Sequence, residues 1–340
     1  MAADGYGRAA ELHLKSLLLL GMNVYVQPTG DWSSQDTDKS VHDLLYRVRK
    51  PTKWGVLHHW PPTEWHGDCR YHIGYSMIEG TRAPSWYVEH VNKKCVALMV
   101  PCTQNVEALR ESGIVRPIHL VPHGLDDHYT YGDLTAGQPI TFGTMGTLTP
   151  RKGTDILLRV WAKAFPKGDE DVRLSIKIRG AYPIRTTDPR VIVYRGEWTP
   201  SRTRNWYQSL TCYVSPTRGE GFGLSPVEAM RCGCATIATN WSGPADYMDD
   251  EYSYPLNIDG MTRTIVDYPI GTDFGEWARP SEGHLIELMR EIAADPVKAR
   301  AKGVLASEVM ANKYPLSLPG ERIVAIIKEY DNAYSDRCWI

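Results

Sequence analysis

The stretch that decides the fold is PTRGEGFGLSPVEAMRCGCATIATNWSGPADY, which occupies residues 216–247. The apolar run CYVSPT (212–217) leads into it, and a glycine-rich loop then precedes an amphipathic segment. Gly219, Gly221 and Gly223 would let the backbone of this loop approach a bound group closely. A strand, a glycine-rich turn and a helix in this order are typical of a parallel α/β sheet, which binds ligands at the carboxyl ends of its strands.

The helix in this stretch is expected to begin at Ser225. Ser225, Pro226 and Glu228 fit the N-cap, the first and the third helical position, so that Ser-Pro-Val-Glu forms a capping box. The free N–H groups and the dipole at such a helix start favour a bound diphosphate. Two interpretations of Glu228 stay open from the residues alone: the carboxylate caps its own helix, or it belongs to a phosphate-binding site.

Short apolar runs alternate with longer amphipathic segments over the rest of the chain, which predicts an α/β fold with parallel sheets. Strands are predicted at residues 22–28, 53–60, 72–77, 95–102, 118–124, 140–146, 173–180, 191–196, 212–217 and 235–240. Helices are predicted at residues 8–20, 41–49, 84–93, 104–112, 155–165, 202–210, 226–231, 284–294 and 321–334.

A polar, turn-rich stretch, DHYTYGDLTAGQ, divides these elements into two sets. We therefore predict two doubly wound Rossmann-like domains with a ligand cleft between them, over residues 1–126 and 139–318, joined by a linker at 127–138. The last helix, within 319–340, is expected to pack back on the first domain. A doubly wound domain usually opens with a strand, yet DGYG stands close to Met1, so the first strand is expected to be missing or to lie upstream.

The net charge and the cysteines argue against general nucleic-acid or membrane binding and against a disulfide-bonded fold. A net charge of −2 gives no reason to expect general binding to nucleic acid or acidic membranes. Seven scattered cysteines do not form a disulfide framework, and Cys232 and Cys234 read as packed thiols of a reducing cytosol. Since no run approaches the roughly 18–20 apolar residues of a membrane helix and the first residues show no secretory pattern, we expect a cytoplasmic protein without stable membrane insertion.

The motif E-G-F-G-L-S-P-V-E places Glu220 and Glu228 in an E-x7-E pattern, and it resembles the retaining GT-B glycosyltransferases of family 4, the glycosyl transferases group 1. Upstream, GTMGTLTPRKGTDILLRVWAKAF (143–165) resembles the family segment G-R-L-x-x-x-K-G-x-D-x-L-x-x-A-F. Downstream, GEWARPSEGHLIELMREIAADP (275–296) resembles the run that follows its nucleotide site. The resemblance covers nearly all of 140–330 and is looser in the first half.

This resemblance implies a fold and an activity. The fold would be GT-B, and the activity would be that of a retaining hexosyl- or pentosyltransferase, which moves a sugar from a nucleoside-diphosphate sugar to a hydroxyl acceptor. In this family the leaving phosphate is thought to accept the acceptor's proton, so the enzyme needs no nucleophile of its own. Neither a metal nor a cofactor is implied, because cations of the protein neutralise the diphosphate, and the absence of a D-x-D sequence agrees with this.

The resemblance also assigns roles at the donor. Glu228 would accept hydrogen bonds from the ribose hydroxyls, and Glu220 would lie near the donor sugar. The backbone N–H groups of Phe222, Gly223 and Leu224 would hold the diphosphate.

Two upstream cations would stabilise the charge that develops on the leaving diphosphate, namely Lys152 and Arg151. For this pair alone, a solvated helix start is the alternative. Ser225, Gly146 and Thr147 complete the implied donor site. Thr147 departs from the family, which usually has Arg at this position, and the departure puts diphosphate affinity and donor type in question.

The first domain is expected to bind the acceptor. Gly5, Tyr6 and Gly7 open the first helix, whose N-terminus could face a phosphate or the acceptor; a plain tight turn is the alternative. His58 and His59 close a predicted strand at its carboxyl end, where ligand-binding residues belong, although a packed or surface histidine is the default interpretation of each.

Glu79 follows the next predicted strand, where it could bind a sugar hydroxyl or assist proton transfer; a salt bridge within the loop is the alternative. The acceptor itself could be a saccharide, a small molecule, a protein, or a modified nucleic-acid base, the last being the one role foreseen for nucleic acid. Two other functions compete with glycosyl transfer. They are a sugar-nucleotide-binding module with impaired catalysis, which Thr147 suggests, and a sugar-nucleotide epimerase on the same fold.

Overall fold

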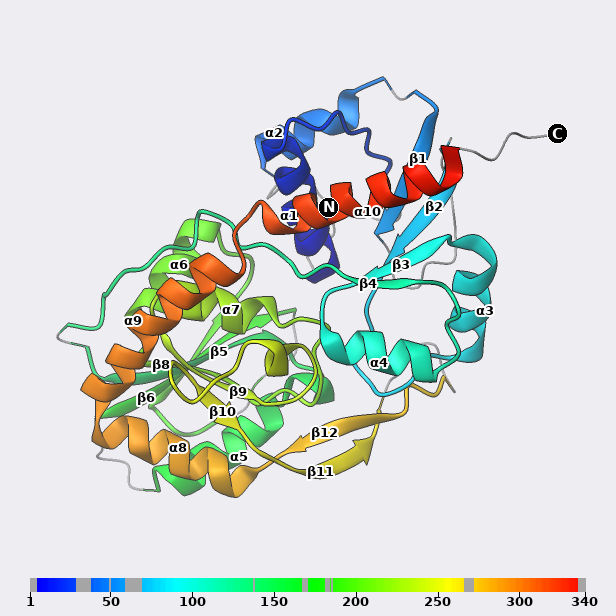
Figure 1. The fold of residues 1–340 in the computed structure, drawn as a ribbon. Coiled ribbons are helices and arrows are strands. Elements are labelled where there is room, and N and C mark those ends of the chain that lie inside the picture. The colour runs from blue at the N-terminus through cyan, green and yellow to red at the C-terminus, as the bar shows by residue number, and fades with distance from the viewer. Residues whose placement is uncertain are drawn as a thin grey trace. The chain divides into compact units, whose positions relative to one another are not determined.

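The computed structural model describes residues 5–28, 38–48, 50–58, 69–136, 138–166, 171–180, 184, 186–265 and 272–335. The chain forms two compact units (Figure 1). The first unit comprises Met1–Ile78, Arg82–Asp126 and Tyr314–Ile340, and the second comprises Glu79–Thr81 and Asp127–Lys313. Within the described ranges, no helix has both the length and the hydropathy needed to cross a bilayer.

The first unit is built on a parallel sheet of four strands in the order β1-β2-β3-β4. The strands are β1 (Thr52–His58), β2 (Cys69–Tyr75), β3 (Ala97–Val100) and β4 (Ile118–Leu120). The helices are α1 (Gly5–Leu19), α2 (Lys39–His42), η1 (Asp43–Tyr46), α3 (Ser85–Lys94), α4 (Thr103–Glu111) and α10 (Leu318–Ser335). Helix α10 packs against α1, although about 300 residues separate them in the sequence: the hydroxyl of Ser16 accepts a hydrogen bond from the Gly320 N–H at 2.8 Å.

Two expectations for this unit are wrong. Residues 22–28, predicted as a strand, have an irregular backbone with partly or fully exposed side chains. Val24, Tyr25 and Val26 have the β-propensity that suggested a strand, but propensity alone does not supply a hydrogen-bonding neighbour in the sheet. The helix predicted at 41–49 is only the single turn α2, capped by the Asp38 side chain, followed by the 3-10 turn η1.

The second unit is built on a parallel sheet of six strands in the order β10-β9-β8-β5-β6-β7. The strands are β5 (Ile140–Thr147), β6 (Val172–Arg179), β7 (Val191–Arg195), β8 (Cys212–Ser215), β9 (Ala235–Thr239) and β10 (Tyr254–Leu256). The chain therefore runs outward from β5 to β7, returns across β5 to β8, and continues in the opposite direction to β10. This doubly wound order places a topological switch point between β5 and β8, where ligands of such sheets bind.

Helices cover both faces of this sheet (Figure 1). The core on one face joins the strands to α5 (Thr154–Ala164) and α8 (Glu282–Ala294), and the apolar stripe of α5 is buried there. The core on the other face joins them to α6 (Pro200–Ser209) and α7 (Leu224–Arg231). The remaining elements are η2 (Pro150–Lys152), η3 (Gly243–Asp246), α9 (Pro296–Lys313) and a two-stranded sheet of β11 (Ile258–Arg263) and β12 (Glu276–Pro280).

Helix α9 was not predicted, because its buried residues are small apart from Met310. Ala299, Gly303 and Ala306 lie in the interior, so the helix shows no stripe of large apolar side chains. At Gly303 an added Cβ would lie 2.3 Å from the Gly233 carbonyl oxygen, which shows how closely the helix approaches the end of α7. Residues 127–138, interpreted as a linker in the sequence, lie along the second unit, where the Leu134 N–H donates to the Gln208 carbonyl.

Candidate functional site

The loops that follow β5 and β8 meet at the switch point of the second unit. Gly153, which precedes α5, has φ +68°, and a Cβ added there would lie 2.0 Å from the carbonyl oxygen of Pro216. The N–H of Arg218 donates to the carbonyl of Arg151 at 2.7 Å. The backbone contacts therefore fix the Arg151-Lys152 turn against the glycine-rich loop.

Charged side chains from both loops form one network. The Lys152 ammonium lies 2.7 Å from Glu220 Oε1, and the Arg151 guanidinium lies 3.1 Å from Glu220 Oε2. Arg151 also donates to the Gly219 carbonyl at 2.7 Å. Glu220 is only 7% exposed. Burial by itself raises the pKa of Glu220, but the charges of Lys152 and then Arg151 outweigh it and hold the pKa below its ordinary value, so the carboxylate is ionised at neutral pH.

Glu79 joins this network from a separate segment of the second unit. Its carboxylate lies 3.2 Å from the Arg151 guanidinium, so Glu79 forms a salt bridge with a residue of another loop and not, as the alternative expected, within its own. The segment is anchored at Thr81, whose N–H donates to the Glu276 carbonyl at 3.2 Å. Two carboxylates and two cations thus balance, and an incoming diphosphate would compete with Glu79 and Glu220 for Arg151 and Lys152.

The backbone of Glu220 is held by hydrogen bonds to the segment of Trp241, Ser242 and Gly243. The Glu220 N–H donates to the Ser242 hydroxyl at 3.0 Å, and the Gly243 N–H donates to the Glu220 carbonyl at 3.0 Å. Ser242 has φ +56°, a conformation that costs a non-glycine residue about 1–3 kcal/mol. A strained backbone next to a buried carboxylate indicates that the position of Glu220 is enforced by its surroundings.

The capping box predicted at Ser225 is wrong. Helix α7 begins at Leu224, and its N-cap is Gly223 in the left-handed conformation at φ +87°. The chain turns into the helix two residues before the expected position because glycine tolerates this backbone conformation. The Gly223 carbonyl accepts a hydrogen bond from the Tyr247 hydroxyl at 3.0 Å. Ser225 and Glu228 therefore lie inside the helix, and the carboxylate does not cap it.

The Glu228 carboxylate instead contacts Tyr207 of α6. Glu228 is 7% exposed, and its carboxylate accepts a hydrogen bond from the Tyr207 hydroxyl at 3.5 Å. That hydroxyl lies 4.0 Å from the sulfur of Met145, in β5. Burial and then the charge of Glu228 raise the pKa of Tyr207, which keeps the phenol a hydrogen-bond donor.

The hydroxyl of Tyr213 lies near both glutamates of the E-x7-E pattern. Burial raises the pKa of Tyr213, and the negative charges of both Glu220 and Glu228 raise it further, which places both carboxylates near the same hydroxyl. This hydroxyl donates to the Met145 carbonyl at 3.4 Å. Tyr207 and Tyr213 were not predicted as site residues, because in the sequence they are ordinary aromatic residues of a helix and a strand.

The remaining donor candidates lie around the same loops. Gly146 and Thr147 end β5, and Thr147 is paired in register with Arg179 of β6. Phe222 is buried and packs on Tyr247, with ring centroids 5.8 Å apart. The second unit therefore brings together the candidates from the upstream turn, the glycine-rich loop and the start of α7.

The candidates of the first unit lie at the start of α1 and the end of β1. Gly5, Tyr6 and Gly7 form the first turn of α1. The Tyr6 hydroxyl donates to the Met77 carbonyl at 3.0 Å and accepts from the Met77 N–H at 3.2 Å, so it fixes the helix start to the segment after β2. His59 lies outside the described residues.

His58 ends β1 within an aromatic and histidine cluster, defined here as His13, His58, Tyr75 and His123. Its ring stacks on Tyr75 with centroids 4.6 Å apart, and His13 Nε2 lies 3.2 Å from His123 Nδ1. Burial and then His58 lower the pKa of His123 to about 3, and burial, His58 and His123 lower that of His13. His13 and His123 are therefore neutral and packed at neutral pH.

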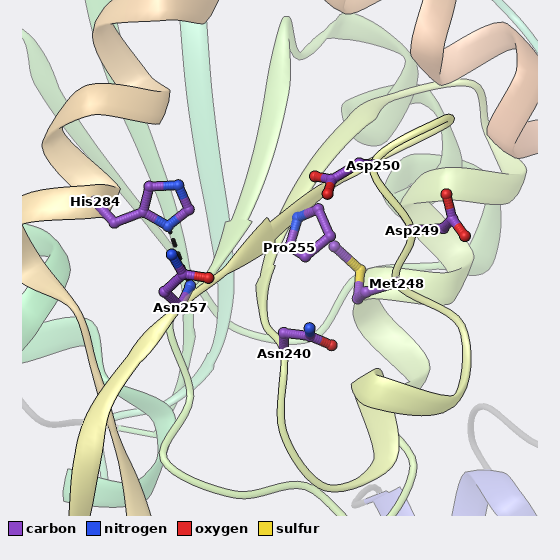
Figure 2. A pocket seen from close by; sticks show the side chains of 7 residues that line it. All are labelled: Asn240, Met248, Asp249, Asp250, Pro255, Asn257 and His284. Carbon is purple, nitrogen blue, oxygen red and sulfur yellow. Dashed lines mark hydrogen bonds between the residues drawn. The ribbon is translucent and has the colours of Figure 1, made fainter.

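A pocket of about 430 Å³ lies elsewhere in the second unit, beyond the ends of β9 and β10 (Figure 2). Its lining residues are Asn240, Met248, Asp249, Asp250, Pro255, Asn257 and His284. His284 is directed toward Asn257, whose N–H donates to His284 Nδ1 at 3.1 Å. None of these seven residues is a candidate from the sequence. Within the described part of the chain, no three or more His, Cys, Asp or Glu side chains are grouped so as to hold a metal ion.

Comparison with known proteins supports the resemblance of the second unit to glycosyltransferases. Residues 139–266 match the family Glycosyl transferases group 1. The lipopolysaccharide core biosynthesis mannosyltransferase LpcC of Rhizobium leguminosarum is 29% identical over 37% of this chain and 40% of that protein. The GDP-mannose-dependent alpha-mannosyltransferase of Mycolicibacterium smegmatis is 27% identical over 55% of this chain and 51% of that protein. The chain thus spans about half the length of these relatives or less.

Solved structures share the fold over most of the chain. Sucrose-phosphate synthase of Thermosynechococcus elongatus superposes with a TM-score of 0.63 at 17% identity, over 83% of this chain and 74% of that one. Anabaena HepE in complex with UDP and glucose superposes with a TM-score of 0.60 at 12% identity, over 76% and 72%. The resemblance and the α/β fold expected from the sequence are confirmed: residues 139–266 match the glycosyl transferases group 1, and the chain has the fold of the GT-B glycosyltransferases.

Proposed function

We propose that this protein transfers a sugar from a nucleoside-diphosphate sugar to a hydroxyl acceptor with retention of the anomeric configuration. The observation that carries the proposal is the network of Lys152, Arg151 and Glu220 at the switch point of the second unit. Such a network offers two cations and a buried carboxylate at the edge of the sheet where ligands of doubly wound folds bind. The UDP in the HepE structure, which shares this fold, supports a nucleotide donor.

The proposed mechanism breaks the bond between the anomeric carbon and the diphosphate oxygen. Negative charge then develops on the leaving phosphate, and Lys152 and Arg151 stabilise it because they are held in place by the backbone of the two loops. The oxygen of the acceptor hydroxyl bonds the anomeric carbon on the face that the phosphate leaves, and its proton passes to that phosphate, which gives retention without an enzymic nucleophile. Glu228 holds the ribose hydroxyls, and Glu220, released from its cations, accepts hydrogen bonds from the donor sugar.

The start of α7 is proposed to hold the diphosphate. Since Gly223 and not a side chain caps this helix, the backbone N–H groups of Phe222, Gly223 and Leu224 are proposed to face the phosphate oxygens. Transfer would then need no metal, and EDTA should leave the rate unchanged. The six described cysteines are free thiols, which supports a reducing, cytoplasmic location. The first unit is proposed to bind the acceptor.

A donor panel tests this proposal. The protein would be incubated with UDP-, GDP-, ADP- and TDP-sugars, with and without simple glycoside acceptors, and nucleotide release would be measured. We expect release with one donor class, an α-linked product from an α-linked donor by NMR, and a loss of at least about 100-fold in kcat for Lys152→Met. Lys163→Met, on the exposed side of α5, is the matched control. An inverted product, or full activity of Lys152→Met, would contradict the proposal.

One observation favours a second candidate, a sugar-nucleotide-binding module with impaired catalysis. Thr147 ends β5 without a charge of its own, and the cation paired with it in register, Arg179, forms an ion pair with Glu197 at 3.3 Å. The same panel separates the two functions. Binding of a sugar nucleotide without release of nucleotide, even by hydrolysis, would indicate the module.

A further inference from the structure

Lys177 is a buried cation that the donor site described above does not use. It lies in β6 and is 5% exposed, and within the described part of the chain its ammonium makes neither an ion pair nor a hydrogen bond. Burial lowers the pKa of Lys177; the charge of Glu197 opposes this, and the charges of Arg179 and Arg202 add to it. Partial burial of an ammonium that has no ion pair disfavours its charged form, as the lowered pKa shows, so its retention in this strand needs a reason.

A buried donor without a partner among the described residues lies beside it. The Lys177 ammonium is 5.8 Å from the centre of the Trp198 ring, and the indole N–H of Trp198 is buried without a partner in the described part of the chain. The guanidinium of Arg202 lies 4.4 Å from the centre of the same ring. The neighbouring Trp206 differs, because its N–H donates to the Ser175 hydroxyl at 2.8 Å. The region around Lys177 therefore has more donors than acceptors, because the carboxylate of Glu197, whose charge acts on Lys177, is already paired with Arg179 at 3.3 Å.

Strand register connects this region to Glu228. Lys177 is the partner of Met145 across β5 and β6. Because side chains alternate along a strand, both lie on the face covered by α6 and α7, opposite the face that buries Leu174 and Ile176. Met145 in turn lies against the Tyr207 hydroxyl, which donates to Glu228. A chain of contacts thus links the proposed ribose-binding carboxylate to Met145, and the backbone of Lys177 lies about one strand spacing beyond Met145 on the same face of the sheet.

We propose that Lys177 determines the specificity for the nucleobase of the donor, by donating a hydrogen bond to a carbonyl oxygen of the base. This inference rests on the proposed function, which places the ribose at Glu228. An ammonium carries three donors and no acceptor. Uracil and guanine offer a carbonyl oxygen at O4 and O6, whereas adenine has an amino group at the corresponding position. The site would therefore select uridine or guanosine diphosphates against adenosine diphosphate.

Calorimetric titration of the full chain with UDP, GDP, ADP and inorganic pyrophosphate tests the inference. The native protein should bind UDP or GDP at least about ten-fold more tightly than ADP, as expected for a hydrogen bond to a charged donor. Lys177→Met, which matches the side chain in length, should remove most of this preference and leave the affinity for ADP and pyrophosphate unchanged. Lys163→Met, whose ammonium pairs with Glu282 at the surface, should change none of the four affinities.

Lys177→Gln keeps a hydrogen-bond donor and should therefore retain part of the preference for UDP or GDP over ADP. This variant replaces Lys177→Met if the Met variant is too unstable to measure. Circular dichroism and thermal melting verify that both variants fold. The inference is overturned if either folded variant keeps the native ratio of affinities. It is also overturned if pyrophosphate binding weakens in parallel with the nucleotides, because Lys177 would then contact phosphate. Should the native chain bind none of the nucleotides, the proposed function itself fails, and this inference fails with it.

Discussion

The ammonium of Lys152 and the carboxylate of Glu220 lie 2.7 Å apart, although 68 residues separate them in the sequence. Each side chain belongs to a loop that follows one of the two central strands, β5 and β8, so the pair spans the switch point of the sheet. Arg151 contacts the other oxygen of the same carboxylate. Glu220 is therefore held ionised in the interior by two cations that a diphosphate would engage.

The first prediction concerns the acid stability that this arrangement confers. The pKa of Glu220 is lower in the folded state than the ordinary value of 4.5, so the folded state binds fewer protons than the unfolded chain in this range. The stabilisation is fully present above pH 4.5 and is lost as the pH falls through the lowered pKa. Glu220→Gln should therefore flatten the fall of the unfolding free energy below pH 4.5, measured by urea denaturation at several pH values. Glu251→Gln, on an exposed turn, is the control, and an equal slope for both variants would contradict the prediction.

The second prediction concerns the cluster of His13, His58, Tyr75 and His123. The pKa of His123 falls to about 3 on folding, so the unfolded chain binds more protons between about pH 6.5 and 3. The free energy of unfolding should therefore decrease as the pH falls below 6.5, by about 2 kcal/mol between pH 7 and pH 5 for His123 alone. His123→Gln should lose this part of the pH dependence even if it lowers stability at pH 7. His128→Gln, at an exposed position, should keep the wild-type slope, and a His123→Gln profile parallel to wild type would show that this histidine does not carry the effect.

The third prediction separates hydrogen bonding from backbone strain at Ser242. Ser242→Ala removes the acceptor of the Glu220 N–H and keeps a Cβ at φ +56°, whereas Ser242→Gly removes the acceptor and relieves the backbone. Thermal denaturation should show both variants destabilised, with Ala less stable than Gly by about 1 kcal/mol. If Gly is the less stable of the two, the conformation of Ser242 is not strained, and the entropy of the unfolded glycine dominates.

The juxtaposition of the two loops of the proposed donor site could be predicted from the sequence because it depends on topology. Lys152 and Glu220 each follow a strand, and the doubly wound order brings the ends of those two strands together. The start of α7 could not be predicted, because the conformation of Gly223 overrides the preference of Ser225 for the N-cap. The strand order follows from the alternation of helices and strands along the chain, whereas the start of a helix depends on a single backbone dihedral.

Lys177 shows a second limit of prediction from the sequence, which concerns the burial of polar residues in a strand. In RLSIKIRG the alternation of Leu, Ile and Ile with Ser and Lys predicts one buried and one exposed face of the strand. The structure buries both faces, since α6 and α7 cover the polar one. A sheet with helices on both sides has two buried faces, and the polar residues on the second face are then candidates for ligand contact rather than for solvation.

The fourth prediction uses glycine to test whether the two loops of the donor site must touch. Gly153→Ala would place a Cβ 2.0 Å from the Pro216 carbonyl oxygen, in addition to the cost of φ +68° for a side chain. Gly196→Ala, at φ +83° with no atom within 4 Å of the added Cβ, carries the dihedral cost alone. The Gly196 variant should lose about 1–2 kcal/mol of stability, and the Gly153 variant should lose clearly more. Nucleotide affinity measured on the folded fraction should fall in Gly153→Ala, because moving the loop separates Lys152 from Glu220. Equal stabilities and affinities for the two variants would mean that the turn after β5 can shift without disturbing the site.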